Sequence, residues 1–109
     1  GEMKHGPIAL IDSSQPVICL VPYSRTHEKM LNNVQEIRAR RAIVLSIATK
    51  GDEDIQKLSN WVFPIPKTPE IFSSILSIIP LQLFAYKISV KNKRDVDQPR
   101  NLAKSVTVE

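Results

Sequence analysis

Two side chains in this 109-residue sequence are of types that suit sugar chemistry, His5 and Lys104. His5 precedes Gly6 and Pro7, which mark a tight turn. An imidazole gives and takes protons near neutral pH, so His5 suits acid/base opening of a sugar ring. A lysine such as Lys104 can form a Schiff base with a ketose carbonyl if its amine is desolvated or its pKa is otherwise lowered. On local sequence alone, a surface histidine and a solvated tail lysine are the commoner interpretations.

The remaining titratable residues give weaker indications. Asp95 and Asp97 are two apart, and such carboxylates bind calcium or act as acid and base, but solvated surface acids are commoner. One cysteine and two histidines are too few for a structural zinc site, and there is no glycine-rich phosphate loop, so we expect no metal and no cofactor. Cys19 lies in an apolar run and is predicted to be a buried, inert thiol. His27, near a helix start, is given no functional interpretation.

Composition is that of a globular protein with at most one domain, with 42% apolar and 24% charged residues. The formal charge of +4 permits an anionic ligand such as a sugar phosphate. Nucleic acid is not an expected partner, because the basic residues are scattered and aromatics are not interleaved with them. The single cysteine and the absence of a charged-then-apolar leader predict a cytoplasmic protein. The stretch from Ile75 to Val90 is predicted to be a core helix, too short and too polar to span a membrane.

Hydrophobic patterning predicts the elements that position these residues. Short apolar runs over 16–21, 42–48 and 61–63 predict buried strands, with Pro64 and Pro66 limiting the third. Met30, Val34 and Ile37 form the stripe of an amphipathic helix that ends near residue 40 or 41. A helical turn is expected over 54–59, and a long helix is expected from Pro69 to about Val90.

Capping residues and a proline refine the helix predictions. Ser24 or Thr26 is expected to cap the first helix, and Thr68 the long one, with Pro69 in its first helical position. Pro80 is expected to kink the long helix. Strands that alternate with helices predict an α/β fold with a parallel sheet covered on both faces, whose ligands bind beyond the carboxyl ends of the strands. Those ends are residues 22–26 and 49–52.

Two segments are specific in sequence: Gly1-Glu2-Met3-Lys4-His5-Gly6-Pro7-Ile8-Ala9-Leu10-Ile11-Asp12 and Asp95-Val96-Asp97-Gln98-Pro99-Arg100-Asn101-Leu102-Ala103-Lys104-Ser105-Val106-Thr107-Val108-Glu109. Both closely resemble one enzyme family, glucosamine-6-phosphate synthase, which is glutamine–fructose-6-phosphate aminotransferase (isomerising). Pro80-Leu81-Gln82-Leu83 with Ala85-Tyr86 resembles the last long helix of that family. The resemblance covers the whole chain and is weakest from about residue 23 to residue 67.

The resemblance implies a fold and residue roles. The fold is the latter part of a sugar isomerase (SIS) domain, a three-layer, flavodoxin-like α/β sandwich, with residues 1–92 in the domain and 93–109 as a tail over the sugar. The lysine matching Lys104 forms the Schiff base with the open-chain sugar, and the backbone matching Ala103 lines the sugar site. The histidine matching His5 assists ring opening in the partner's site, across a dimer interface. The resemblance therefore implies a homodimer or a higher homo-oligomer.

The family also has parts that this sequence does not contain. They are a Ser/Thr-rich phosphate-binding loop, an isomerase glutamate, and a glutaminase domain with an N-terminal cysteine nucleophile. We therefore expect a portion of a longer enzyme, inactive as a synthase by itself. Two alternatives stay open: a stand-alone SIS-type module that binds a phosphosugar and regulates, and a piece that serves mainly in oligomerisation.

Overall fold

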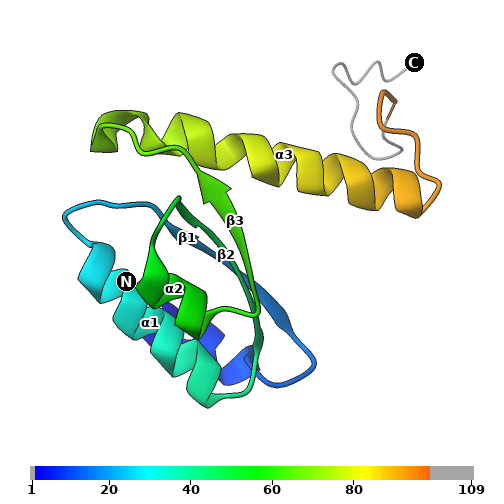
Figure 1. Ribbon diagram of the computed structural model, residues 1–109. Helices are drawn as coiled ribbons and strands as arrows, with labels where there is room; N and C mark the ends of the chain where they lie inside the picture. The colour runs from blue at the N-terminus through cyan, green and yellow to red at the C-terminus, as the bar shows by residue number, and fades with distance from the viewer. Residues whose placement is uncertain (1, 99–109) are drawn as a thin grey trace, which may run out of the picture. The chain divides into compact units, whose positions relative to one another are not determined.

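The computed structural model describes residues 2–98. By their internal contacts the residues divide into two units, 1–77 and 78–109, and each is considered by itself. Three short 3₁₀ helices, three strands and three α-helices follow one another along the chain (Figure 1): η1 (Glu2–His5), η2 (Pro7–Leu10), β1 (Pro16–Val21), α1 (His27–Ala39), β2 (Ile43–Thr49), α2 (Glu53–Leu58), β3 (Trp61–Ile65), η3 (Glu70–Phe72) and α3 (Ser73–Lys91).

The strands form one parallel sheet in the order β1-β2-β3. Pro16 lies opposite Ile43, and Leu45 lies opposite Trp61. The register brings the carboxyl ends of β1 and β2 together, because Val21 lies opposite Ala48. The predicted α/β fold with a parallel sheet is thus confirmed, and the first two strands fall within one residue of their predicted bounds.

The third strand is longer than its prolines led us to expect. β3 continues through Pro64 to Ile65, and Pro64 lies opposite Ala48 of β2. The carbonyl of Ile65 accepts a hydrogen bond from the amide of Lys50 at 2.8 Å, so Ile65 directs its backbone polar groups toward β2. Successive residues of a strand direct these groups to opposite sides, which turns the nitrogen of Pro64 away from β2. The missing N–H of Pro64 therefore removes no hydrogen bond between β2 and β3, as is usual for proline in an edge strand.

One face of the sheet carries the core. Val34 and Ile37 of α1 and Ile55 of α2 are buried there against Val21 and Val44 of the strands. Figure 1 shows α1 and α2 side by side, and the two helices contact each other as well as the strands. The predicted stripe is therefore the buried face of α1, and burying it supplies the largest favourable contribution to this packing.

Both predicted side-chain caps differ from what the structure shows. Thr26 is the residue before α1, but its side chain caps no backbone amide, because its hydroxyl lies 3.2 Å from that of Ser24. Before the long helix, Pro69 rather than Thr68 precedes the first turn, which is the separate 3₁₀ helix η3. Pro80 lies inside α3, which continues past it to Lys91.

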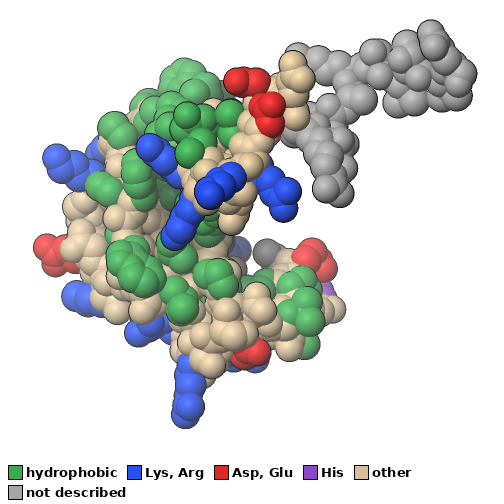
Figure 2. Space-filling view, turned by 90° about the vertical axis from the view of Figure 1, so that its right-hand side faces the viewer, with side chains coloured by type: hydrophobic (Ala, Val, Ile, Leu, Met, Phe, Trp, Pro, Cys, Tyr) green, Lys and Arg blue, Asp and Glu red, His purple; other side chains and the backbone are tan. Residues whose placement is uncertain are grey.

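The long helical segment corrects one composition-based expectation. Residues Glu70–Lys91 are long and apolar enough to cross a membrane, as judged by length and composition alone. Core helices of soluble proteins pass the same test, so this is weak support for a span. Many apolar side chains of the described residues are exposed, and Figure 2 shows hydrophobic groups at the surface. On α3 these are Ile75, Ile78, Ile79, Leu83, Phe84, Tyr86, Ile88 and Val90.

Candidate functional site

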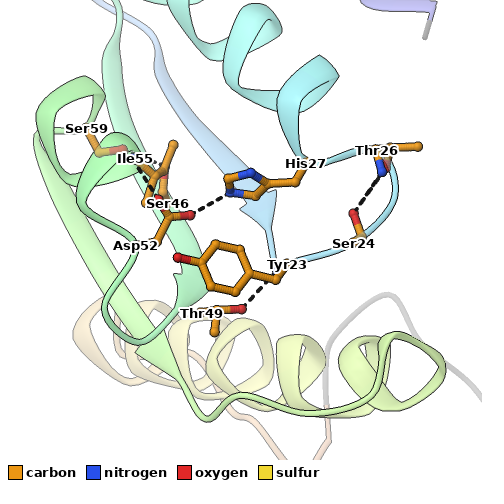
Figure 3. Close-up of polar contacts among 9 residues, drawn as sticks. All are labelled: Tyr23, Ser24, Thr26, His27, Ser46, Thr49, Asp52, Ile55 and Ser59. Atoms are coloured by element: carbon orange, nitrogen blue, oxygen red, sulfur yellow. Dashed lines mark hydrogen bonds and ion pairs between the residues drawn. The ribbon is translucent and has the colours of Figure 1, made fainter.

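The loops that follow β1 and β2 meet at the carboxyl edge of the sheet, where the sequence predicts a ligand site. The amide of Tyr23 donates to the hydroxyl of Thr49 at 2.9 Å, which joins the two strand ends (Figure 3). The ring of Tyr23 stands edge-on to the ring of His27, with centroids 4.9 Å apart. Residues 22–27 and 49–52 therefore lie together at this edge, where two strand ends meet the start of α1.

A histidine–aspartate pair with a buried carboxylate lies at this edge. Nε2 of His27 is 2.6 Å from Oδ2 of Asp52, and the side chains are 16% and 2% exposed, respectively. Figure 3 shows the two side chains pointing toward each other from the first residue of α1 and the residue before α2. A carboxylate only accepts hydrogen bonds, so the imidazole donates from Nε2.

The other oxygen of Asp52 is also used. Oδ1 accepts from the amide of Ile55 at 3.1 Å, so Asp52 is the N-cap of α2. One buried carboxylate thus fixes the first turns of two helices at the same sheet edge. Buried polar groups are costly unless they are hydrogen-bonded, and both oxygens of Asp52 meet that requirement.

The sequence does not predict this pair. Its patterns give no functional interpretation for His27, and they place Asp52 in a ligand-site loop without a role of its own. The signal for Asp52 was present, since an aspartate followed by Glu53 and Asp54 before an apolar residue is typical of a helix start. No comparable signal pointed to His27, because the residues are 25 apart and only the β1–α1–β2 crossover brings them together.

Flanking groups at the same edge are more exposed. Arg25 lies with Nε 3.5 Å from Oε2 of Glu70, and the Arg25 side chain is 91% exposed. Behind the edge, the hydroxyls of Ser46 and Ser59 are 2.7 Å apart, which satisfies the buried side chain of Ser46. These side-chain contacts hold the backbone at this edge in place, and Arg25 remains accessible to solvent.

His5 is presented to solvent from η1. Its side chain is 73% exposed, and Nδ1 is 3.0 Å from Oε2 of Glu2. The neighbouring Lys4 reaches α1, where Nζ is 2.5 Å from Oε1 of Glu36. Met3 packs against the core. The side chain of His5 is therefore hydrogen-bonded to Glu2, and no described hydrogen bond joins it to the His27–Asp52 pair.

The remaining predicted residues fall in two groups. Lys104 and Ala103 lie outside the described residues. Asp95 accepts from the amides of Gln98 at 3.0 Å and Asp97 at 2.9 Å, and these hydrogen bonds lower its pKa. Asp95 thus organises a turn. Within residues 2–98, no group of three or more His, Cys, Asp or Glu side chains is placed to hold a metal ion.

Comparison with known proteins identifies the family. Residues 1–91 match the family model described as "SIS domain". The chain belongs to the SIS domain family. A solved structure of the C-terminal domain of glucosamine-fructose-6-phosphate aminotransferase from Francisella tularensis is similar, with a TM-score of 0.79 and 32% identity. The similarity covers 91% of this chain and 28% of that one.

Curated relatives point the same way. The chain is 56% identical over 109 residues to glutamine–fructose-6-phosphate aminotransferase [isomerizing] of Aquifex aeolicus, and equally so to that of Thermus thermophilus. In both cases the match covers 100% of this chain and 18% of the relative. The predicted resemblance and the predicted SIS fold are confirmed, and the chain spans under a fifth of the length of these relatives.

Proposed function

We propose that this chain forms part of the isomerase domain of a glutamine–fructose-6-phosphate aminotransferase. That enzyme makes glucosamine 6-phosphate from fructose 6-phosphate and ammonia derived from glutamine, a step in amino sugar biosynthesis. The observation that carries the proposal is 56% identity to two such enzymes along the full 109 residues. The α/β sheet and the SIS family match support it.

His5 is proposed as the acid/base group that assists ring opening. Its exposure of 73% leaves the imidazole accessible to a sugar bound by a second subunit. When Glu2 accepts a hydrogen bond from Nδ1–H, the neutral ring leaves Nε2 free to take a proton. The local geometry therefore suits proton transfer to or from a sugar hydroxyl across an interface.

Lys104 is proposed as the Schiff-base lysine, with the backbone of Ala103 lining the sugar site. The amine attacks the carbonyl carbon of open-chain fructose 6-phosphate, and the carbonyl oxygen leaves as water. A tail formed by residues 93–109 would cover the sugar, while residues 1–92 form the domain. The support for this step is the resemblance of the tail to the family.

Partners and location follow from the same proposal. The ligand is a sugar phosphate, and the assembly is a homodimer or a higher homo-oligomer in the cytoplasm. No cofactor, nucleic acid or membrane takes part in the proposed reaction. The acid/base group and the lysine amine supply the chemistry.

A chimaera tests the proposal directly. The 109 matching residues of the Aquifex aeolicus enzyme are replaced by this chain, and glucosamine 6-phosphate is measured with glutamine and fructose 6-phosphate as substrates. We expect an active enzyme that borohydride labels at Lys104 in the presence of fructose 6-phosphate. Lys104→Arg should abolish the label, because guanidinium is not a usable nucleophile at neutral pH. A well-folded but inactive chimaera, or a label elsewhere, would contradict the proposal.

A second candidate is a phosphosugar-binding regulatory module. The observation in its favour is that the family match, over residues 1–91, names a domain and no reaction. Calorimetric titration of the chain with glucosamine 6-phosphate separates the two candidates. Micromolar binding by the chain alone would favour the regulatory module, and absence of binding would favour the proposed portion of an enzyme.

A further inference from the structure

We propose that Glu36 is a positioning residue for His5, acting through Lys4. The inference rests on the proposed acid/base role of His5. It adds to that role a residue on another element, 31 positions along the chain, which does not touch the sugar.

The orientation of η1, which carries His5, depends on contacts with other elements. η1 has four residues and none of them is buried. A 3₁₀ turn of this length has few and poorly aligned hydrogen bonds, so its orientation depends on contacts with other elements. Besides its contacts with the adjacent η2, these are the packing of Met3 against the core and the ion pair between Lys4 and Glu36.

The ion pair sets the direction of the neighbouring side chain. In a 3₁₀ helix three residues make one turn, so consecutive side chains point about 120° apart and residues three apart share a side. Because Lys4 is directed at Glu36 on α1, the His5 side chain is turned about 120° from that direction, and it is 73% exposed. Glu2 lies on the same side as His5 and holds its Nδ1.

Glu36 is well placed to act as the fixed partner. It lies between Val34 and Ile37, both buried, so the backbone that carries it is held by the core. Its side chain is 33% exposed against 55% for Lys4, which leaves the carboxylate less solvated than its partner. Ion pairs this exposed contribute little to stability. We therefore expect the loss of Glu36 to affect the placement of His5 more than the fold.

Steady-state kinetics of the chimaeric enzyme test the inference. Glu36→Ala is expected to lower kcat on the order of tenfold, with KM for fructose 6-phosphate unchanged within about twofold, because misplacing a catalytic group by about 1 Å costs up to about a hundredfold. Glu28→Ala is the matched control, since Glu28 is a glutamate of the same helix that lies eight residues, or about 12 Å, along α1 from Glu36, and it should keep the parent kcat. An unchanged kcat in Glu36→Ala would overturn the inference.

A double-mutant comparison separates positioning from a general structural effect. If Glu36 acts only through His5, Glu36→Ala should cause no further loss in a His5→Gln background. An additive loss would contradict the inference. If His5→Gln alone leaves activity unchanged, the proposed role of His5 fails instead, so the two failures are distinguishable.

A measurement on the 109-residue chain does not depend on activity. By NMR, Glu36→Ala is expected to shift the ring resonances of His5 and to increase amide exchange at residues 4–6, whereas Glu28→Ala is expected to change neither. Unchanged His5 resonances in Glu36→Ala would overturn the inference even if the chimaera proved inactive.

Discussion

Replacing Asp52 by alanine should destabilise the chain more than most single substitutions. The carboxylate is 2% exposed, caps the amide of Ile55 and accepts a hydrogen bond from His27 at 2.6 Å. Alanine removes both interactions at once and leaves the imidazole, 16% exposed, without this partner. The loss therefore falls on the first turns of α1 and α2 together.

The magnitude follows from the two interactions. A lost N-cap costs about 1 kcal/mol. A lost hydrogen bond to a charged group costs about 1.5–3 kcal/mol. The free energy of unfolding should fall by about 3 kcal/mol, which for a chain of about 100 residues lowers Tm by roughly 12–24 °C.

Urea unfolding followed by circular dichroism measures this loss. Asp52→Asn should cost less, about 1–2 kcal/mol, because asparagine is an equally good N-cap and keeps an acceptor for Ile55. Asp54→Ala is the matched control, since Asp54 lies in the first turn of the same helix with a 71% exposed side chain paired to Lys57. It should cost less than about 1 kcal/mol.

The result that would refute this reasoning is specific. The losses for Asp52→Ala and His27→Ala should be non-additive by on the order of 1–2 kcal/mol, since the two residues share one hydrogen bond. Strict additivity would show that the pair contributes no coupling. An Asp52→Ala loss as small as that of Asp54→Ala would show that the carboxylate is not buried as described.

Three further predictions concern the core and the backbone. Burial raises the pKa of Cys19 to about 11, so in the folded chain the thiol stays protonated at pH 8 and should react with iodoacetamide only after denaturant is added. Ile55→Ala, at a fully buried position, should lower the free energy of unfolding by about 2–5 kcal/mol. The same change at Ile71, which is 79% exposed, should cost far less; equal losses in urea titrations would contradict the assigned core. Arg41 has φ of 65° and Gly51 has φ of 89°, so Arg41→Gly should stabilise the chain and Gly51→Ala destabilise it, each by about 1 kcal/mol. Thermal unfolding checks both signs.

Much of the fold could be predicted because local pattern and burial agree. The run from Pro16 to Val21 is rich in β-branched residues and bounded by proline, and it is β1. The stripe of Met30, Val34 and Ile37 repeats at helical spacing, and two of its members are fully or almost fully buried. These features depend on neighbours in the sequence, which a single sequence records.

The missed features depend on neighbours in space. Pro64 is tolerated in β3 because its nitrogen faces away from β2, and the sequence does not say which side of a strand is occupied. Thr26 fails to cap α1 because its hydroxyl pairs with Ser24 instead. His27 and Asp52 meet only through the crossover between β1 and β2. The proposed roles of His5 and Lys104 rest on resemblance to a family, since neither lies in a pattern that is specific by itself.

The position of Pro64 also determines at which edge of the sheet a further strand can pair. At the outer side of β3 the ring offers no donor where an added strand would need one, so pairing there is interrupted midway. In β1 the proline is only at the first residue, Pro16, so every residue from Val17 to Val21 that faces the outer side has an N–H for pairing there. Any strand that extends this sheet, from the same polypeptide or from another, should therefore add beyond β1.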